Sequence, residues 1–270
     1  MMNTAGRKLY EMNLAGQTLF YTFKHEDAAR WFEWHLCQVM NTALSSGESG
    51  DPSSMMTGYQ GPLFVPEDLL ERRRPIFSAG VPDDYMEYRV CVEVTGRALA
   101  DRGCFLFHAT AFEWRGFAWL MTAPSGTGKS TQYHNWKKLW PDEVSILCGD
   151  MPALSLDDGG NVWVHPSPWN GKEREGFENH HSVPLGGIVF LKQGDADSIE
   201  NAPLDKLIRP LWHQFIGQAD TELQIRNREH FLDHMLRHYP FWLLENRGDY
   251  SSAQLTKSTF EEYLSRRQMG

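Results

Sequence analysis

The chain has 270 residues, of which 41% are hydrophobic and 23% are charged, values that are ordinary for a soluble globular protein. Its length allows one large domain or two smaller ones with a substantial core. The formal net charge of −9 would repel nucleic acid and anionic membrane surfaces, so we expect neither as a partner.

The sequence predicts neither a membrane span nor a secretory signal, because no window approaches the roughly 18 consecutive apolar residues that a spanning helix needs. The four cysteines are widely spaced and form no C-x-x-C pair; they are Cys37, Cys91, Cys104 and Cys148. We therefore expect reduced thiols rather than a disulfide framework or a zinc site, and a cytoplasmic protein.

Residues 1–80 are predicted to form a small N-terminal region. Apolar side chains alternate along residues 10–14 and 19–23, on either side of an Ala-Gly-Gln turn, which predicts a β-hairpin. Apolar residues then recur at helical spacing over residues 27–40, so we expect a helix there. Ser, Gly and Pro dominate residues 41–62, which is typical of a flexible linker.

Residues 81–270 are predicted to form the main domain. The ERRRP run at residues 71–75 just before it is interpreted as a solvated loop rather than a nucleic-acid patch, given the acidic chain. The expected helices cover residues 84–102, 129–140, 204–216, 227–239 and from 251 onward. The expected strands cover residues 103–112, 117–121, 144–150, 152–156, 161–165, 185–191 and 240–246.

A glycine-rich segment separates a predicted strand from a predicted helix. Residues 123–130, APSGTGKS, fit the Walker A pattern with Ala123 in place of the usual first glycine. In this pattern glycines let backbone amides face the phosphates, the lysine adds a point charge, and the serine hydroxyl binds Mg²⁺. The predicted nucleotide-binding residues are Ser125, Gly126, Thr127, Gly128, Lys129, Ser130 and Thr131.

An acidic residue at the end of a nearby strand is the second part of such a site. Asp150 ends the apolar segment VSILCGD, about 20 residues beyond the loop. The alternative is an ordinary turn residue, since Gly-Asp is common in turns. We favour a metal site at Ser130 and Asp150, because Lys129 needs an acidic partner and no other strand end offers one as well.

Four segments resemble the superfamily of HPr kinase/phosphorylase and phosphoenolpyruvate carboxykinase, most of all its small bacterial HPr-kinase-like serine kinases. They are FLFHATAFEWRGFAWLMTAPSGTGKST, ILCGDMPAL, PSPWNGKE and VPLGGIVFLKQ, within residues 84–250. The resemblance implies an α/β fold in which the P-loop lies in a mixed, largely antiparallel sheet flanked by helices. The hairpins predicted around the loop agree with it.

The resemblance also implies phosphoryl transfer to a serine hydroxyl. His108 matches a family histidine and is a candidate general base or orienting residue, although a core histidine on an apolar strand is an equal alternative. Lys172, in the PSPWNGKE segment, would neutralise the transferred phosphoryl group, with Arg174 as a second candidate, unless both are surface cations. Trp169 is either loop packing or a substrate platform.

One position departs from the family pattern. HPr kinases carry two adjacent aspartates where this chain has Gly149 followed by Asp150, so only the second acid remains. A different feature, the histidines at 230, 234 and 238, has helical spacing, but the sequence lacks an H-E-x-x-H pattern. We interpret those histidines, and the pair at 180 and 181, as solvated residues.

The leading hypothesis is therefore an ATP-dependent kinase that transfers the γ-phosphoryl group to a serine hydroxyl of a peptide, a protein or a small molecule, with Mg²⁺ as cofactor. His108, Lys129, Asp150 and Lys172 are its candidate catalytic residues. The alternative is a nucleotide-binding accessory protein with little turnover, which the missing acid favours. A phosphoenolpyruvate carboxykinase is less favoured, because the chain is short. The donor identity and a possible homo-oligomer stay open.

Overall fold

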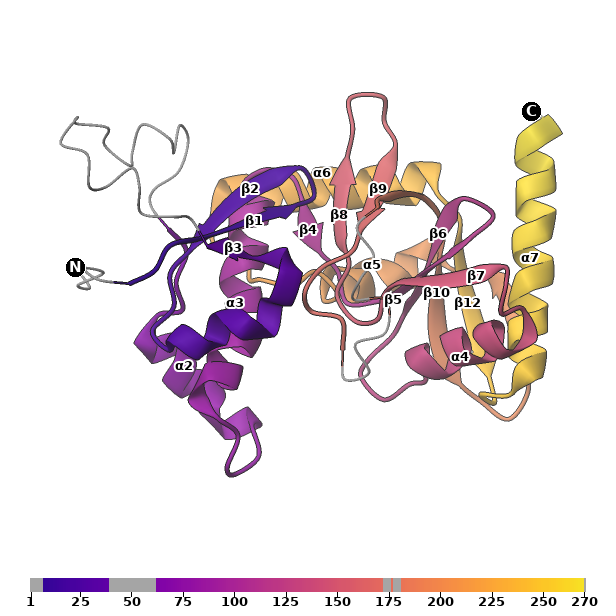
Figure 1. Ribbon diagram of the computed structural model, residues 1–270. Helices are drawn as coiled ribbons and strands as arrows, with labels where there is room; N and C mark the ends of the chain where they lie inside the picture. The colour runs from indigo at the N-terminus through magenta and orange to yellow at the C-terminus, as the bar shows by residue number, and fades with distance from the viewer. Residues whose placement is uncertain (1–6, 39–61, 172–175, 177–180, 270) are drawn as a thin grey trace.

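The computed structural model describes residues 7–38, 62–171, 176 and 181–269, which fold into two β-sheets with flanking helices (Figure 1). The strands are β1 (Tyr10–Leu14), β2 (Gln17–Tyr21), β3 (Cys37–Gln38), β4 (Phe105–Leu106), β5 (Thr110–Trp114), β6 (Phe117–Thr122), β7 (Val144–Cys148), β8 (Ala153–Leu156), β9 (Val162–His165), β10 (Val183–Gln193), β11 (Ser198–Asn201) and β12 (Phe241–Asn246). The helices are η1 (Glu26–His35), α2 (Glu67–Arg73), η3 (Arg74–Ile76), α3 (Asp83–Ala100), α4 (Lys129–Leu139), α5 (Leu204–Trp212), α6 (Glu222–His238) and α7 (Tyr250–Met269).

The larger sheet is mixed, as expected from the sequence. Its long strand β10 runs parallel to β6 on one edge and to β12 on the other, and its first residues pair antiparallel with β9. All other pairings in this sheet are antiparallel, including β5 with β6 and β5 with β7. Strand β6, which leads into the glycine-rich segment, is therefore held between β5 and β10.

Helices cover both faces of this sheet. Along β6, Ala118 and Leu120 belong to a core closed by α5 and α6, whereas Trp119 and Met121 face a second core closed by α4 and α7. In Figure 1 α4 and α7 lie close together at the right of the molecule. The Phe260 ring of α7 stacks on Trp119 with ring centroids 3.8 Å apart. The period of two along β6 thus separates two cores, and the buried tryptophans Trp114, Trp119, Trp136 and Trp242 all lie in the second of them.

The N-terminal hairpin and η1 pack against α3 in a third core. Phe32 of η1 is fully buried and contacts the rings of Tyr88 and Trp169. The Trp169 Nε1–H donates to the Tyr88 carbonyl oxygen at 3.2 Å, and the Tyr88 hydroxyl donates to the Pro168 carbonyl oxygen at 2.8 Å. Trp169 is therefore a packing residue, and the substrate-platform alternative for it is wrong.

A buried carboxylate also attaches this region to α3. Glu87 is 1% exposed, and its two oxygens accept hydrogen bonds from the backbone N–H groups of Lys24 and His25, at 2.7 and 2.8 Å. Since a buried carboxylate is stable only when its oxygens are well satisfied, these bonds fix the entry of η1 against α3.

Two predictions for the N-terminal region are wrong. The helix expected over residues 27–40 is a 3₁₀ element that ends at His35; Glu33 has a φ of 47°, which interrupts the helix, and β3 then pairs with the open edge of β1. The arginines of residues 71–75 are exposed as predicted, but Arg72 and Arg73 lie in helix α2 rather than in a loop. The linker at 41–62 lies outside the described residues except for its last position.

The single strand predicted over residues 103–112 is wrong, because this stretch forms two strands, β4 and β5, with His108 between them, and β11 was not predicted. The remaining predicted elements of the main domain agree with the structure to within a few residues. Helix α6 begins earlier than predicted, at Glu222, because the Thr221 side chain and the Gln224 side chain form a reciprocal capping box. None of the helices in the described ranges combines the length and apolar composition that crossing a bilayer requires.

Trp169→Ala should lower the free energy of unfolding by about 3–5 kcal/mol, because it empties a fully buried site between η1 and α3. Urea unfolding followed by circular dichroism measures this loss. The matched control is Trp163→Ala on the β8–β9 hairpin, where the half-buried ring should cost less. Equal losses in the two variants would contradict the packing role of Trp169.

Candidate active site

The glycine-rich loop, residues 123–128, connects the end of β6 to the start of α4. Gly126 and Gly128 have φ values of 82° and 108°, a region that residues with a Cβ rarely adopt. Thr127 closes the turn, since its hydroxyl donates to the Pro124 carbonyl oxygen at 2.8 Å. Gly128 is the N-cap residue of α4 and has no side chain that could accept hydrogen bonds from the first backbone amides of this helix. These amides, and the positive end of the helix dipole, are therefore available to a ligand. An anion is the ligand that such a helix start favours.

A cleft of about 810 Å³ opens between this loop and helix α3. Its lining combines residues from distant parts of the chain: the loop and the start of α4, the ends of β4 and β7, the segment around Asn170, and α3 with η3. All the predicted nucleotide-binding residues except Thr127 line it, namely Ser125, Gly126, Gly128, Lys129, Ser130 and Thr131. His108 and Asp150 line it as well.

Three predicted catalytic side chains meet in this cleft. The Lys129 ammonium lies 3.1 Å from His108 Nε2 and donates to the Ala123 carbonyl oxygen at 3.2 Å. The Asp150 carboxylate lies 3.5 Å from His108 Nε2. Lysine, histidine and aspartate therefore form one cluster at the start of α4, although His108 and Asp150 are 42 positions apart in the sequence.

Backbone pairing places Ala109, the residue after His108, opposite Asp150. The amide of Ala109 donates to the Asp150 carbonyl oxygen at 2.9 Å, and the amide of Phe107 donates to Pro152 at 2.9 Å. These bonds lie between the β4–β8 pairing and the β5–β7 pairing, so residues 105–114 run antiparallel to residues 144–154 almost without interruption. The ladder therefore sets Asp150 next to His108, one position off direct pairing, and the two side chains come within 3.5 Å of each other.

The hydrogen bonds of Gln214 determine which His108 nitrogen carries the proton. The Gln214 side-chain amide donates to the Pro210 carbonyl oxygen at 3.2 Å, which leaves its Oε1 to accept from His108 Nδ1 at 3.0 Å. Nδ1 is therefore the protonated nitrogen of the neutral ring, and Nε2 presents its lone pair to the cleft. Lys129 donates to that lone pair.

Burial changes the acidity of both charged groups. Burial lowers the pKa of Lys129, and the negative charge of Asp150 offsets part of this effect. Burial alone would raise the pKa of Asp150, but the hydrogen bond and positive charge that His108 supplies in its protonated form, together with the charges of Arg89 and Lys129, outweigh it and lower that pKa. The carboxylate is thus ionised at neutral pH, the form that binds a divalent cation. Ser130 lines the same cleft, so this pair fits the oxygen ligands that Mg²⁺ prefers.

Asn170 occupies the space beside Gly149. The Gly149 amide donates to Asn170 Oδ1, and the Thr110 hydroxyl donates to the Gly149 carbonyl oxygen at 2.9 Å. A Cβ at position 149 would lie 2.5 Å from the Asn170 carbonyl oxygen and 3.0 Å from its Oδ1. The first aspartate of the HPr kinase pair therefore does not fit at Gly149 unless Asn170 moves.

The other predicted residues lie elsewhere. Lys172 and Arg174, like His180, fall outside the described residues, so the phosphoryl-neutralising role stays a prediction. His181 bonds to Glu113, and His234 donates to the Gly160 carbonyl oxygen. Within the described ranges no group of three His, Cys, Asp or Glu side chains is placed to hold a metal ion.

Sequence reasoning missed four residues that line or support the cleft: Arg89, Thr110, Asn170 and Gln214. Asn170 directly follows Trp169 in the PSPWNGKE segment, so the resemblance of that segment indicated this part of the site. Gln214 lies 106 residues from His108, and nothing in the local sequence points to their contact. Only the folded chain shows it.

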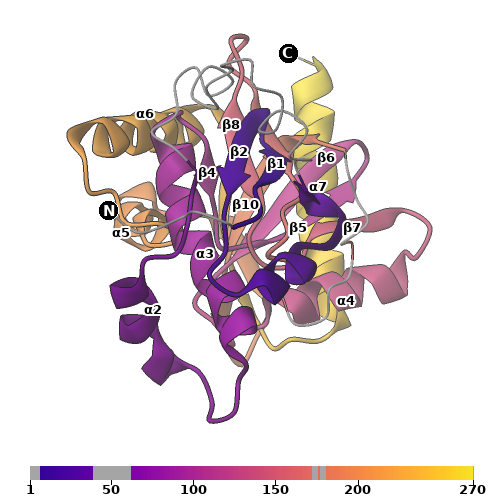
Figure 2. The same cartoon turned by 60° about the vertical axis from the view of Figure 1, so that its left-hand side comes forward.

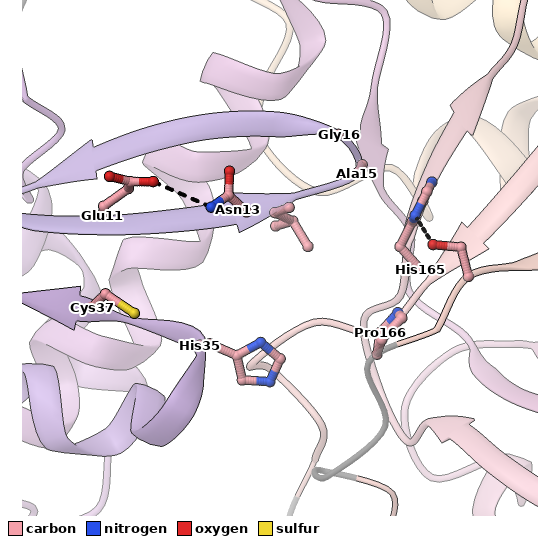
Figure 3. A pocket seen from close by; sticks show the side chains of 10 residues that line it. Glu11, Asn13, Ala15, Gly16, His35, Cys37, His165 and Pro166 are labelled. Atoms are coloured by element: carbon pink, nitrogen blue, oxygen red, sulfur yellow. Dashed lines mark hydrogen bonds between the residues drawn. The ribbon is translucent and has the colours of Figure 1, made fainter. Parts of the chain in front are cut away.

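A second, smaller pocket lies between the N-terminal hairpin and β9 (Figure 3). Its volume is about 350 Å³, and Glu11, His35, Cys37 and His165 are among its lining residues. Burial lowers the pKa of His165 to about 4, and the His165 ring bonds to the Ser182 hydroxyl at 2.6 Å. None of the predicted site residues lines this pocket, so the larger cleft is the candidate active site.

Comparisons with known proteins place the chain in a family. It belongs to the ScmC family, because the family model described as SynChlorMet cassette protein ScmC matches residues 85–245. No curated protein sequence matches it significantly. Among solved structures, the HPr(Ser) kinase/phosphatase from Coxiella burnetii is similar over 49% of this chain and 91% of that one, with 11% identity and a TM-score of 0.28. The structural relation to HPr kinases is therefore weak.

Gly149→Ala should lower the free energy of unfolding by roughly 1–3 kcal/mol, because the added Cβ would press against the Asn170 backbone. Denaturant unfolding measures the change. In the control, Gly159→Ala, the nearest atoms belong to the side chains of Asn161 and Asp157, which can rotate away, so a smaller effect is expected. A fully stable Gly149→Ala protein would contradict the close contact with Asn170.

Asp150→Asn should flatten the acid dependence of stability. The pKa of Asp150 is lower in the folded chain than the usual 3.8, so the ionised carboxylate stabilises the fold above that value. This stability is lost as the pH falls through the folded pKa. Urea unfolding at neutral pH and below pH 4 should therefore show a smaller decrease for the variant. The control is Asp142→Asn, on the exposed turn after α4. An equal loss of unfolding free energy between neutral pH and below pH 4 in Asp150→Asn and wild type would contradict this reasoning.

Proposed function

We propose that this protein is an ATP-dependent kinase that transfers the γ-phosphoryl group to a serine hydroxyl. The observation that carries the proposal is the convergence of Lys129, His108 and Asp150 in one cleft, at a helix start that follows a Walker A sequence. The resemblance to HPr-kinase-like proteins supports serine as the acceptor. ATP and Mg²⁺ are the ligands that this chemistry requires.

In this proposal the loop amides and the start of α4 bind the nucleotide phosphates, and Lys129 neutralises charge on the β- and γ-phosphates. The ammonium fits this task because it is held by the Ala123 carbonyl oxygen and faces the cleft. Ser130 and Asp150 would hold Mg²⁺, which supplies further positive charge for the transferred group. Charges that are positioned in advance in this way stabilise the charge that develops on the transferred group.

His108 would receive the proton of the acceptor hydroxyl. Gln214 keeps the proton of the neutral ring on Nδ1, so Nε2 is the basic atom. When phosphate oxygens take over the hydrogen bonds of Lys129, the Nε2 lone pair is released for the hydroxyl proton. The serine oxygen then bonds to the γ-phosphorus, the bond to the bridging oxygen breaks, and ADP leaves. Asp150, 3.5 Å away, stabilises the resulting imidazolium.

The second candidate is a nucleotide-binding accessory protein with little turnover. The packing of Asn170 against Gly149 favours it, because this contact leaves no space at position 149 for the first acid of the HPr kinase pair. The two proposals predict the same nucleotide binding and differ in whether label passes to an acceptor.

His108→Ala should reduce phosphoryl transfer by about 10²–10⁴-fold while ATP binding is retained, because the variant loses the general base but keeps the loop. Lys129→Ala should abolish both. The measurement combines γ-labelled ATP, Mg²⁺ and serine-containing peptides, including those encoded beside the gene, with calorimetric titration of ATP.

The exposed His213→Ala, which lies next to Gln214 but outside the cleft, is the control and should retain transfer. Tight ATP binding by the wild type with no labelled acceptor would support the accessory protein. Full transfer by His108→Ala would exclude His108 as the base.

A further inference from the structure

We propose that the cleft wall formed by α3 and η3 is the acceptor subsite, and that Arg89 binds a carboxylate adjacent to the acceptor serine. This inference rests on the kinase function proposed above. It assigns a substrate class to the same cleft: a peptide with an acidic group beside its serine and an apolar side chain nearby.

The cleft has two walls with different character. One wall is the glycine-rich loop with the start of α4, which the nucleotide phosphates would occupy. The opposite wall belongs to α3 and η3, and Figure 2 shows α3 between α2 and the strands of the large sheet. Its lining residues are Arg73, Ile76, Phe77, Tyr85, Arg89 and Glu93. The clustered His108 and Asp150 line the same cleft, so a group held on this second wall is within reach of the base.

Arg89 differs from the neighbouring arginines in its pairing. Arg72 pairs with Asp68, Arg73 with Glu93, and Arg74 with Glu71 and Asp83. Arg89, in contrast, has no ion-pair partner in the part of the chain that the structure describes, although its half-buried side chain lines the cleft. Since partial burial without a partner is costly for a guanidinium, a ligand carboxylate would offset that cost.

Arg89 lines the same cleft as the reacting groups. It is close enough to Asp150 to contribute to the low pKa of that carboxyl. An acidic acceptor that approaches Asp150 and the nucleotide phosphates meets like charge on both sides, so it needs a cation on its own wall. The phosphates already have Lys129 and the loop amides, which leaves Arg89 for the acceptor. A bidentate guanidinium–carboxylate pair would also fix the serine relative to His108 Nε2.

Apolar side chains surround this cation. Ile76 is 72% exposed on η3, and Phe77 and Tyr85 are half-buried beside it. A large exposed aliphatic group next to aromatic rings at a cleft favours burial of a ligand side chain. The Arg73–Glu93 pair joins the end of α2 to α3 at 2.6 Å and the Arg74–Asp83 pair joins η3 to α3 at 2.9 Å, so this apolar surface is preformed. The wall thus offers one cation and one apolar surface to the same ligand.

The test uses two pairs of acetylated peptides, each with one leucine and one serine. In the first pair the residue after serine is either Asp or Asn. In the second pair serine is the last residue and carries either a free C-terminal carboxylate or a C-terminal amide. Wild type should prefer the acidic member of at least one pair by about 10- to 100-fold in kcat/KM. Arg89→Gln should remove this preference through a higher KM for the acidic peptide, with an unchanged Kd for ATP. Arg72→Gln, at an exposed ion pair outside the cleft, should retain it.

A fluorescence binding assay with the same peptides separates this inference from the kinase function. Peptides that bind with an Arg89-dependent preference for carboxylate but receive no label would contradict the kinase and leave the subsite intact. Transfer without a carboxylate preference, or a preference that survives Arg89→Gln, would overturn the subsite. Loss of ATP affinity in Arg89→Gln would assign Arg89 to the nucleotide instead, and the absence of both binding and transfer would overturn both proposals.

Discussion

The antiparallel ladder between residues 105–114 and residues 144–154 is the constraint on which the candidate site depends. It continues from the β4–β8 pairing to the β5–β7 pairing through backbone bonds at Phe107 and Ala109. Since register fixes which residues of a ladder are paired, Asp150 lies opposite Ala109 and therefore beside His108. Strand β6 pairs with β5 and places the loop beside them. A slip of one residue would move Asp150 away from this position.

The contacts among the side chains beside this ladder explain how charged groups are stabilised in a partly buried site. The Lys129 ammonium loses hydration there, which is why its pKa falls, but it retains the Ala123 carbonyl oxygen and the His108 lone pair as acceptors. Asp150 keeps its charge because cations surround it. Each group compensates for the desolvation of another, so the removal of one should disturb the rest. Such interdependence is typical of sites in which charge has to be present before a ligand arrives.

Local sequence patterns predicted the parts of the site that are contiguous in the chain. The strand, loop and helix around Lys129 and the acid at the end of β7 follow from spacing and glycine positions. The capping box at Thr221 could also have been predicted from the sequence, and because it was overlooked the predicted start of α6 is too late. In contrast, the contact of Gln214 with His108 depends on tertiary pairing between distant segments, and the interruption of η1 depends on a single positive φ at Glu33. Neither of these features has a local pattern that would reveal it.

Helix α3 connects the N-terminal region to the site through three consecutive residues. Glu87 accepts hydrogen bonds from the backbone of Lys24 and His25, Tyr88 packs on the Pro168–Trp169 segment, and Arg89 lines the cleft. Successive helical residues point about 100° apart, so one turn of α3 faces three different parts of the molecule. A shift of this turn would therefore move Arg89 and the segment that carries Asn170 together. The N-terminal region thus contributes to the geometry of the cleft through α3.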